Sequence, residues 1–301
     1  MEPIDSAYEA PDGTALPMRV WPGARADPDA SGPVAPAPTD RPHAALVYLH
    51  GIQSHSGWYE GSSRRLAEVG VAVYQIERRG SGRDAHHERG HVERAETWLA
   101  DVAAAAERAR SETKVERVHL MGVSWGGKLA LACSAHRPDL YRSLIMASPG
   151  IFPIVDVAAM TKVRVATSLM AGRPLRRFPI PLSDPHLFTE NPERIRYIAE
   201  DPLSLREVTA RFMYESRRLD RLARRAARTA RLPVFLALAG ADRITDNAAT
   251  RALVETMPAA RKRIVTYAGA HHTLEFEPDP EAYFKDLVAW VDDVERAEPN
   301  A

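Results

Sequence analysis

The segment Gly122–Gly126, which reads GVSWG, constrains the fold of this chain more than any other feature. An apolar run over Val115–Met121 precedes it, and an alanine-rich run that ends before Pro138 follows it. A strand, a sharp turn and a helix are the context that a G-x-S-x-G motif requires. A serine hydroxyl is a weak nucleophile, so chemistry at Ser124 also needs a base, an orienting acid and an oxyanion site. The alternative is a turn that only joins two elements.

Short apolar runs recur along the chain and predict six buried strands. They cover Ala44–Leu49, Val71–Ile76, Val115–Met121, Ser143–Ala147, Val234–Ala239 and Arg263–Tyr267. Near-continuous apolar runs fit a parallel sheet that is covered on both faces. The amphipathic stretches between them predict helices. This alternation indicates the α/β class with a doubly wound sheet, preceded by a weak hairpin around Asp12 and Gly13.

Two stretches interrupt the alternation. The proline-rich residues 22–42 predict an exposed surface loop, with a partner-binding segment as the alternative. Residues 150–231 have a mostly helical pattern with no convincing strand. An insertion of this length predicts a helical cap over the carboxyl edge of the sheet, where open α/β sheets bind ligands. The expected core therefore comprises residues 1–149 and 232–301.

The base and the acid are expected after the serine, in the chain order Ser, Asp, His. Asp242 follows the fifth predicted strand, and the pair His271 and His272 follows the sixth. Because neighbouring parallel strands end at one edge of the sheet, these side chains are expected beside Ser124. A buried carboxylate there fixes the imidazole tautomer and stabilises the imidazolium. The alternatives are an Asx turn at Asp242, Asp246 as the acid, and an exposed or metal-binding histidine pair.

An oxyanion site needs two backbone N–H groups that point at the developing negative charge. The helix after the serine offers the N–H of Trp125, because the first N–H groups of a helix have no partner within it. The loop after the first predicted strand contains Gly51, which permits close backbone approach. The N–H of Ile52 is therefore the predicted second donor. His50 and His55 precede the serine and are interpreted as hydrogen-bonding residues that shape this loop.

Four stretches together resemble the α/β-hydrolase fold, and specifically its monoacylglycerol lipase and lysophospholipase branch: HGIQSHSGWY, GVSWGG, GADRITD and GAHHTL. The similarity covers nearly the whole chain and extends to DPLSL in the predicted cap. The branch has its catalytic histidine as the third residue after a glycine, which selects His272 when counted from Gly269. Two positions depart from the branch. Ser54 replaces a usual acidic residue, and ERRGSG replaces Asp-x-x-Gly-His-Gly, which bears on lipid preference.

This resemblance implies a serine carboxylic ester hydrolase that works through an acyl-enzyme. Ser124 would attack the ester carbonyl, His272 would carry the proton, Asp242 would orient His272, and Ile52 and Trp125 would hold the oxyanion. The implied substrate is a monoacylglycerol, a lysophospholipid or a similar ester, with no metal or organic cofactor. The alternatives are an acyltransferase or a thioesterase with the same residues, and a non-catalytic binding protein on the same fold.

Composition bears on partners and location. The 40 basic and 40 acidic side chains give a formal net charge of +0, which favours no nucleic-acid partner. Cys133 is the single cysteine, no signal peptide is visible and no apolar run could span a bilayer, so a cytoplasmic protein is expected. The arginine-rich residues 217–231 predict a solvated amphipathic helix, with transient contact between the cap and an anionic membrane surface as the alternative. The oligomeric state is left open.

Overall fold

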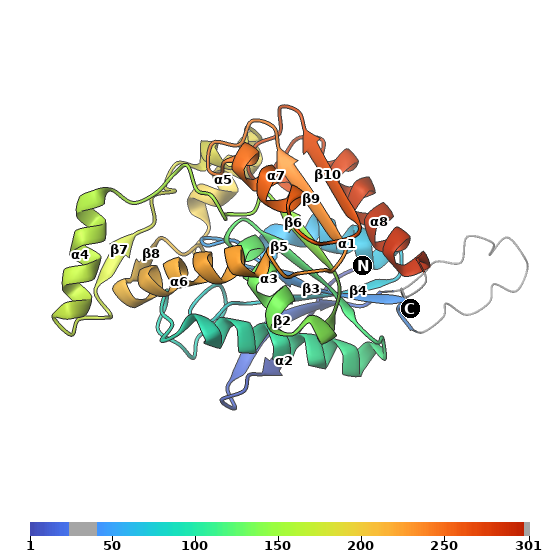
Figure 1. Ribbon diagram of the computed structural model, residues 1–301, viewed down its shortest axis with the longest axis horizontal. Coiled ribbons are helices and arrows are strands. Elements are labelled where there is room, and N and C mark those ends of the chain that lie inside the picture. Colours follow the sequence, from blue (N-terminus) through green and yellow to red (C-terminus); the bar gives the residue numbers. More distant parts are fainter. Residues whose placement is uncertain (24–40, 298–301) are drawn as a thin grey trace, which may run out of the picture.

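An eight-stranded sheet forms the centre of the computed structural model, which describes residues 1–23 and 41–297 (Figure 1). The strand order is β1-β2-β4-β3-β5-β6-β9-β10. The strands are β1 (Ile4–Glu9), β2 (Ala15–Trp21), β3 (Ala44–Leu49), β4 (Val71–Ile76), β5 (Val118–Val123), β6 (Tyr141–Ala147), β9 (Val234–Ala239) and β10 (Lys262–Tyr267). Most of the proline-rich stretch 22–42 lies outside the described residues.

Six of these strands, from β4 across to β10, pair in parallel, whereas β1 and β2 pair antiparallel. Strands β3, β4, β5 and β9 are buried along their whole length, as their nearly continuous apolar runs predict. The predicted doubly wound sheet and its N-terminal hairpin are thereby confirmed. Strand β5 begins at Val118 and not at the predicted Val115, because Glu116 and Arg117 are exposed in the loop before it.

Helices cover both faces of the sheet (Figure 1). They are α1 (Glu60–Glu68), α2 (Ala95–Thr113), α3 (Trp125–His136), α7 (Asn247–Glu255) and α8 (Glu281–Arg296). Because β3 lies between β4 and β5, the chain reverses its winding direction after β4. Right-handed crossovers then place α1 and α2 on opposite faces. The parallel strands share a direction, so the loops after β3, β4, β5, β9 and β10 all meet at one edge.

Between β6 and β9 the chain forms an inserted segment, residues 148–233, much of which lies to one side of the sheet (Figure 1). It contains α4 (Ala159–Met170), β7 (Arg177–Pro179), α5 (Pro192–Glu200), β8 (Glu207–Thr209) and α6 (Ala210–Ala226). The antiparallel pair β7 and β8 was not predicted, because three residues per strand leave no alternating pattern to detect. Helix α6 packs against α3 and so ties the segment to the core.

None of the helices in the described ranges combines the length and the hydropathy that crossing a bilayer requires.

Candidate active site

Ser124 lies in the turn between β5 and α3 with a φ of +53°, a conformation that residues with a side chain rarely adopt. Backbone hydrogen bonds close this turn. The N–H of Ser124 donates to the carbonyl of Ala147 at 3.0 Å, and its own carbonyl accepts from Gly127 at 2.9 Å and from Gly150 at 2.7 Å. Strain of this kind persists only where the surroundings determine the conformation, and it is concentrated at functional sites.

The two glycines of the motif are required by packing. A Cβ on Gly122 would lie 2.2 Å from the carbonyl oxygen of Gly126. A Cβ on Gly126 would lie 2.3 Å from the carbonyl oxygen of Leu49 at the end of β3. Helix α3 can therefore begin this close to β3 and β5 only because both positions lack a side chain.

Three side chains from the loops after β5, β9 and β10 form a hydrogen-bonded chain. Nε2 of His272 lies 2.8 Å from Oγ of Ser124, and Nδ1 of His272 lies 2.8 Å from Oδ2 of Asp242. The side chains of His272 and Asp242 are 1% and 0% exposed. This is the arrangement that catalysis by a serine nucleophile requires, with a base in contact with the serine and a buried acid that orients the base.

The carboxylate of Asp242 is held by several donors. Its Oδ1 accepts the N–H of Ile244 at 2.8 Å and that of Thr245 at 3.2 Å, while Oδ2 accepts the hydroxyl of Thr245 at 2.8 Å and faces His272. Burial alone would raise the pKa of this carboxyl, but His272 and these hydrogen bonds hold the pKa below its ordinary value. Asp242 therefore forms an Asx turn with one oxygen and orients His272 with the other.

The two alternatives for the base and the acid lie elsewhere. The imidazole of His271 is directed between the carboxylates of two glutamates, 3.2 Å and 3.3 Å away. Asp246 is the N-cap of α7, where it accepts a backbone N–H at 3.0 Å. The structure thus brings His272 and Asp242 to Ser124, and not His271 or Asp246.

The two predicted oxyanion donors flank the nucleophile. Ile52 and Trp125 border the same cavity as Ser124. Gly51 approaches so closely that a Cβ on it would lie 3.4 Å from Cβ of Ser124. Among the described residues, the backbone N–H groups of Ile52 and Trp125 have no hydrogen-bond acceptor. Two uncommitted N–H groups beside a serine hydroxyl are the donors that an oxyanion site needs.

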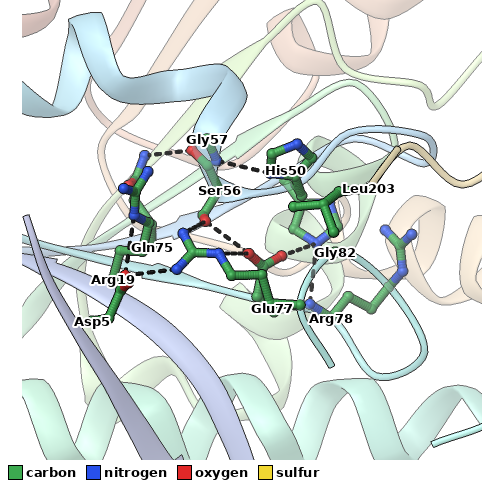
Figure 2. Close-up of polar contacts among 12 residues, drawn as sticks. Asp5, Arg19, His50, Ser56, Gly57, Gln75, Glu77, Arg78, Gly82 and Leu203 are labelled. Atoms are coloured by element: carbon green, nitrogen blue, oxygen red, sulfur yellow. Dashed lines mark hydrogen bonds and ion pairs between the residues drawn. The ribbon is translucent and has the colours of Figure 1, made fainter. Parts of the chain in front are cut away.

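His50 shapes the loop that carries Ile52. Its Nε2 accepts the N–H of Arg78 at 3.1 Å, so its Nδ1 carries the proton and donates to the carbonyl of Gly51 at 2.8 Å. Burial, with the nearby charge of Arg78, keeps the pKa of His50 well below its usual value, and the ring is neutral. Figure 2 shows His50 and Ser56 on either side of Glu77, with Arg78 next to them.

His55 connects the same loop to the inserted segment. Its Nε2 lies 3.1 Å from Oδ2 of Asp201, which also accepts the indole N–H of Trp58 at 2.7 Å. The N–H of Leu205 donates to the carbonyl of Gln53 at 2.9 Å. The DPLSL stretch is therefore hydrogen-bonded to the loop that carries Ile52.

A cavity of about 350 Å³ opens at Ser124 between the core and the inserted segment. Most of its wall is apolar. Apolar residues of the inserted segment form much of the wall, among them Val165, Leu169, Ile180, Leu182, Val208 and Phe212. The nucleophile thus faces an apolar space that the core alone does not enclose.

Two buried cations beside this site were missed in the sequence. Arg78 lies in ERRGSG just after β4, and Lys128 lies one helical turn after Ser124 on α3. Their exposed fractions are 6% and 5%. Neither was predicted to be a site residue, because arginine and lysine are seldom buried. Their positions in the sequence could have indicated the site. Arg78 follows the end of a parallel strand, and Lys128 lies four residues after Ser124 on the helix, so both are expected near the nucleophile.

Comparison with known proteins places this geometry in a family. A human monoglyceride lipase is 27% identical over 259 residues, which cover 84% of each chain. A monoacylglycerol lipase of Mycolicibacterium smegmatis is 24% identical over 84% of this chain and 90% of its own. The structure of a Paleococcus ferrophilus monoacylglycerol lipase superposes with a TM-score of 0.76 at 23% identity, over 98% of this chain and 100% of the other. The profile of the family described as serine aminopeptidase, S33, matches residues 40–279. This protein therefore belongs to the serine aminopeptidase S33 family and has the α/β-hydrolase fold.

Proposed function

We propose that this protein is a serine carboxylic ester hydrolase that cleaves a single-acyl lipid, such as a monoacylglycerol or a lysophospholipid, through an acyl-enzyme. One observation carries the proposal: the hydroxyl of Ser124, hydrogen-bonded to His272 and through it to Asp242, faces an apolar cavity. The names of the human and mycobacterial relatives, which align over 84% of this chain, support the same substrate class.

Acylation follows from the contacts in the site. His272 accepts the proton of Ser124 as the hydroxyl oxygen attacks the ester carbonyl. The N–H groups of Ile52 and Trp125 donate hydrogen bonds to the oxyanion of the tetrahedral intermediate. His272 then gives the proton to the leaving alcohol, and the acyl group stays on Ser124. Throughout, anionic Asp242 holds the imidazole with Nε2 toward Ser124 and stabilises the imidazolium.

Deacylation repeats these roles with water as the nucleophile. His272 takes a proton from the water molecule as its oxygen attacks the acyl carbonyl of the ester on Ser124. Collapse of the second tetrahedral intermediate breaks the bond to Oγ, and His272 returns the proton to Ser124. The free acid leaves, and the enzyme is restored. Protein groups and water supply every proton in these steps.

The cavity suits an acyl chain. Its volume of about 350 Å³ falls in the range of small-molecule sites, roughly 300–1,000 Å³. Burying a methylene group contributes ~0.8 kcal/mol, so an apolar wall selects for chain length. Residues 150–231, assigned here as the cap, supply much of that wall, and Ser124 supplies the reacting atom at one end.

The charges of the cavity favour an ester over a peptide substrate. An aminopeptidase must bind the α-ammonium group of its substrate, and an unpaired carboxylate is the usual partner for such a cation. The carboxylates of the described wall are Asp156 and Asp220. Asp220 lies 2.6 Å from Nζ of Lys128, and Asp156 lies 2.7 Å from Nζ of Lys162. Each carboxylate is already paired with a cation.

The test is hydrolysis of aryl esters from acetate to palmitate, with monoacylglycerol and lysophosphatidylcholine alongside. Turnover is expected to rise about fourfold in kcat/KM per added methylene until the cavity is full. Ser124→Ala should abolish turnover. Ser148→Ala is the matched control, because Ser148 is also buried, has a φ of +41° and lies outside the proposed machinery. Turnover of short chains alone, or turnover that survives in Ser124→Ala, would contradict the proposal.

A further inference from the structure

The guanidinium of Arg78 is buried against the loop that carries Ile52. Its NH1 group donates to the carbonyl of Gly51 at 3.0 Å. Its NH2 group donates to the carbonyl of Ile52 at 2.8 Å and to the hydroxyl of Ser81 at 2.7 Å. One side chain from the end of β4 thus holds two consecutive carbonyls of the loop after β3.

The same guanidinium lies over the indole of Trp125, the residue that offers the other N–H. Its Cζ is 4.6 Å from the centroid of the Trp125 ring and 5.5 Å from that of Phe212. A cation is attracted to an aromatic face, and more strongly where water is excluded. Arg78 therefore links the two segments whose N–H groups flank Ser124.

The bond from Arg78 to Gly51 determines where the N–H of Ile52 points. The carbonyl of Gly51 and the N–H of Ile52 belong to one planar trans peptide, in which C=O and N–H point in opposite directions. With the carbonyl held toward Arg78, the N–H is directed away from it. His50 donates to the same carbonyl at 2.8 Å, so two donors hold this peptide plane. Donors on a carbonyl also polarise the peptide and strengthen its N–H as a donor.

A packing role alone does not account for a cation at this position. The neighbouring carboxylate, Glu77, accepts the hydroxyl of Ser56 and faces His50 (Figure 2). Within the described ranges, Arg78 itself forms no ion pair with a carboxylate. Removing an unpaired charge from water is costly, and an apolar side chain would fill the same volume at lower cost. What the guanidinium contributes is its pair of bonds to the loop carbonyls.

We propose that Arg78 is a positioning residue for the oxyanion site, holding the Gly51–Ile52 peptide so that the N–H of Ile52 faces the tetrahedral intermediate on Ser124. This inference rests on the proposed ester hydrolysis. Because the oxyanion exists only after attack, Arg78 stabilises the transition state and contributes little to the affinity for the substrate. Removing Arg78 is therefore expected to lower kcat and to leave KM nearly unchanged.

The experiment compares Arg78→Met, Arg78→Lys and a control, Arg83→Met, on one aryl ester. Arg83 is a nearby arginine that contacts Asp5 and Ser56 and does not contact the carbonyls of Gly51 and Ile52. The affinity of each variant for an alkylboronic acid is measured as well, since its tetrahedral adduct with serine places an oxygen at the oxyanion position. Circular dichroism and thermal melting establish that each variant is folded.

Removing one oxyanion donor costs about 10²–10³-fold in kcat, so Arg78→Met should lose about 10²-fold with KM changed less than about threefold. Boronic acid affinity should fall by a similar factor, and Arg83→Met should match the wild type. Arg78→Lys keeps a cation but cannot bridge two carbonyls, so it should lose at least about tenfold. If the Lys variant, or a folded Met variant, keeps the wild-type kcat, the role of Arg78 is overturned while the ester hydrolase stands. Absence of Ser124-dependent hydrolysis in the wild type would overturn both.

Discussion

Replacing Asp242 with asparagine changes one atom and tests the whole chain of hydrogen bonds at Ser124. In the native site Oδ1 accepts two backbone N–H groups, from Ile244 and Thr245. An asparagine amide can satisfy those donors only with its oxygen. Its NH₂ group then replaces Oδ2 and faces Nδ1 of His272, which in the wild type lies 2.8 Å from that oxygen.

The consequence is a change of tautomer. An NH₂ group donates, so Nδ1 of His272 must accept, and the imidazole proton moves to Nε2. Nε2 lies 2.8 Å from Oγ of Ser124 and can no longer accept the serine proton. Exchanges of this type in serine hydrolases cost about 10⁴-fold in kcat, or about 5 kcal/mol in the barrier. Folding should be little affected, because the amide satisfies the same backbone donors.

The assay is steady-state hydrolysis of an aryl ester at about pH 8, with urea unfolding measured in parallel. Thr245→Val is the matched control, since it removes the 2.8 Å hydroxyl bond to Asp242 and leaves the carboxylate facing His272. We expect the control to lose about a hundredfold at most, as one hydrogen bond to a charged group contributes ~1.5–3 kcal/mol. An Asp242→Asn enzyme within tenfold of the wild type would refute the role assigned to the carboxylate.

Two further predictions concern stability. Gly126→Ala should destabilise the fold by about 3 kcal/mol or more, because its Cβ would lie 2.3 Å from a backbone oxygen. Gly172→Ala should cost only ~1–2 kcal/mol, since that site is open and only its φ of +66° is unfavourable. Equal urea midpoints for the two variants would contradict this. Burial raises the pKa of Glu275 from 4.5 to about 7, so the folded state binds its proton more tightly than the unfolded chain does. The contribution of this proton to the free energy of unfolding is fully present below about pH 4.5. It is lost as the pH rises through 7, which lowers the free energy of unfolding by about 3 kcal/mol. Glu275→Gln should lack that loss, so its stability relative to the wild type should increase between about pH 5 and pH 8; a constant difference would exclude the mechanism.

Much of the core was predictable because its signals are local. Strands β3, β4 and β9 have the predicted bounds, since each is a nearly continuous apolar run bounded by a polar residue, a glycine or a proline. The glycines around Ser124 marked the strand–turn–helix junction. Once the parallel sheet was inferred, strand ends had to share one edge, so Asp242 and the histidine pair were expected beside Ser124 before any distance was known.

Other features depend on contacts between distant segments, and no local pattern encodes them. Position in the chain left His271 and His272 equivalent, and only a family resemblance favoured His272. The tertiary structure separates them, because one ring faces Ser124 and the other two glutamates.

The burial of a charged side chain is the feature that the sequence predicts least well. In the sequence, Arg78 is one of several charged residues in the ERRGSG stretch. Only the fold shows that two backbone carbonyls and an indole surround its guanidinium. The cavity likewise exists only where the inserted segment meets the core. Hydrophobic pattern and chain order thus determine the sheet and the edge at which the nucleophile lies. The partners of a buried charge and the shape of a cavity are decided by packing between residues far apart in the chain, which only the tertiary structure brings together.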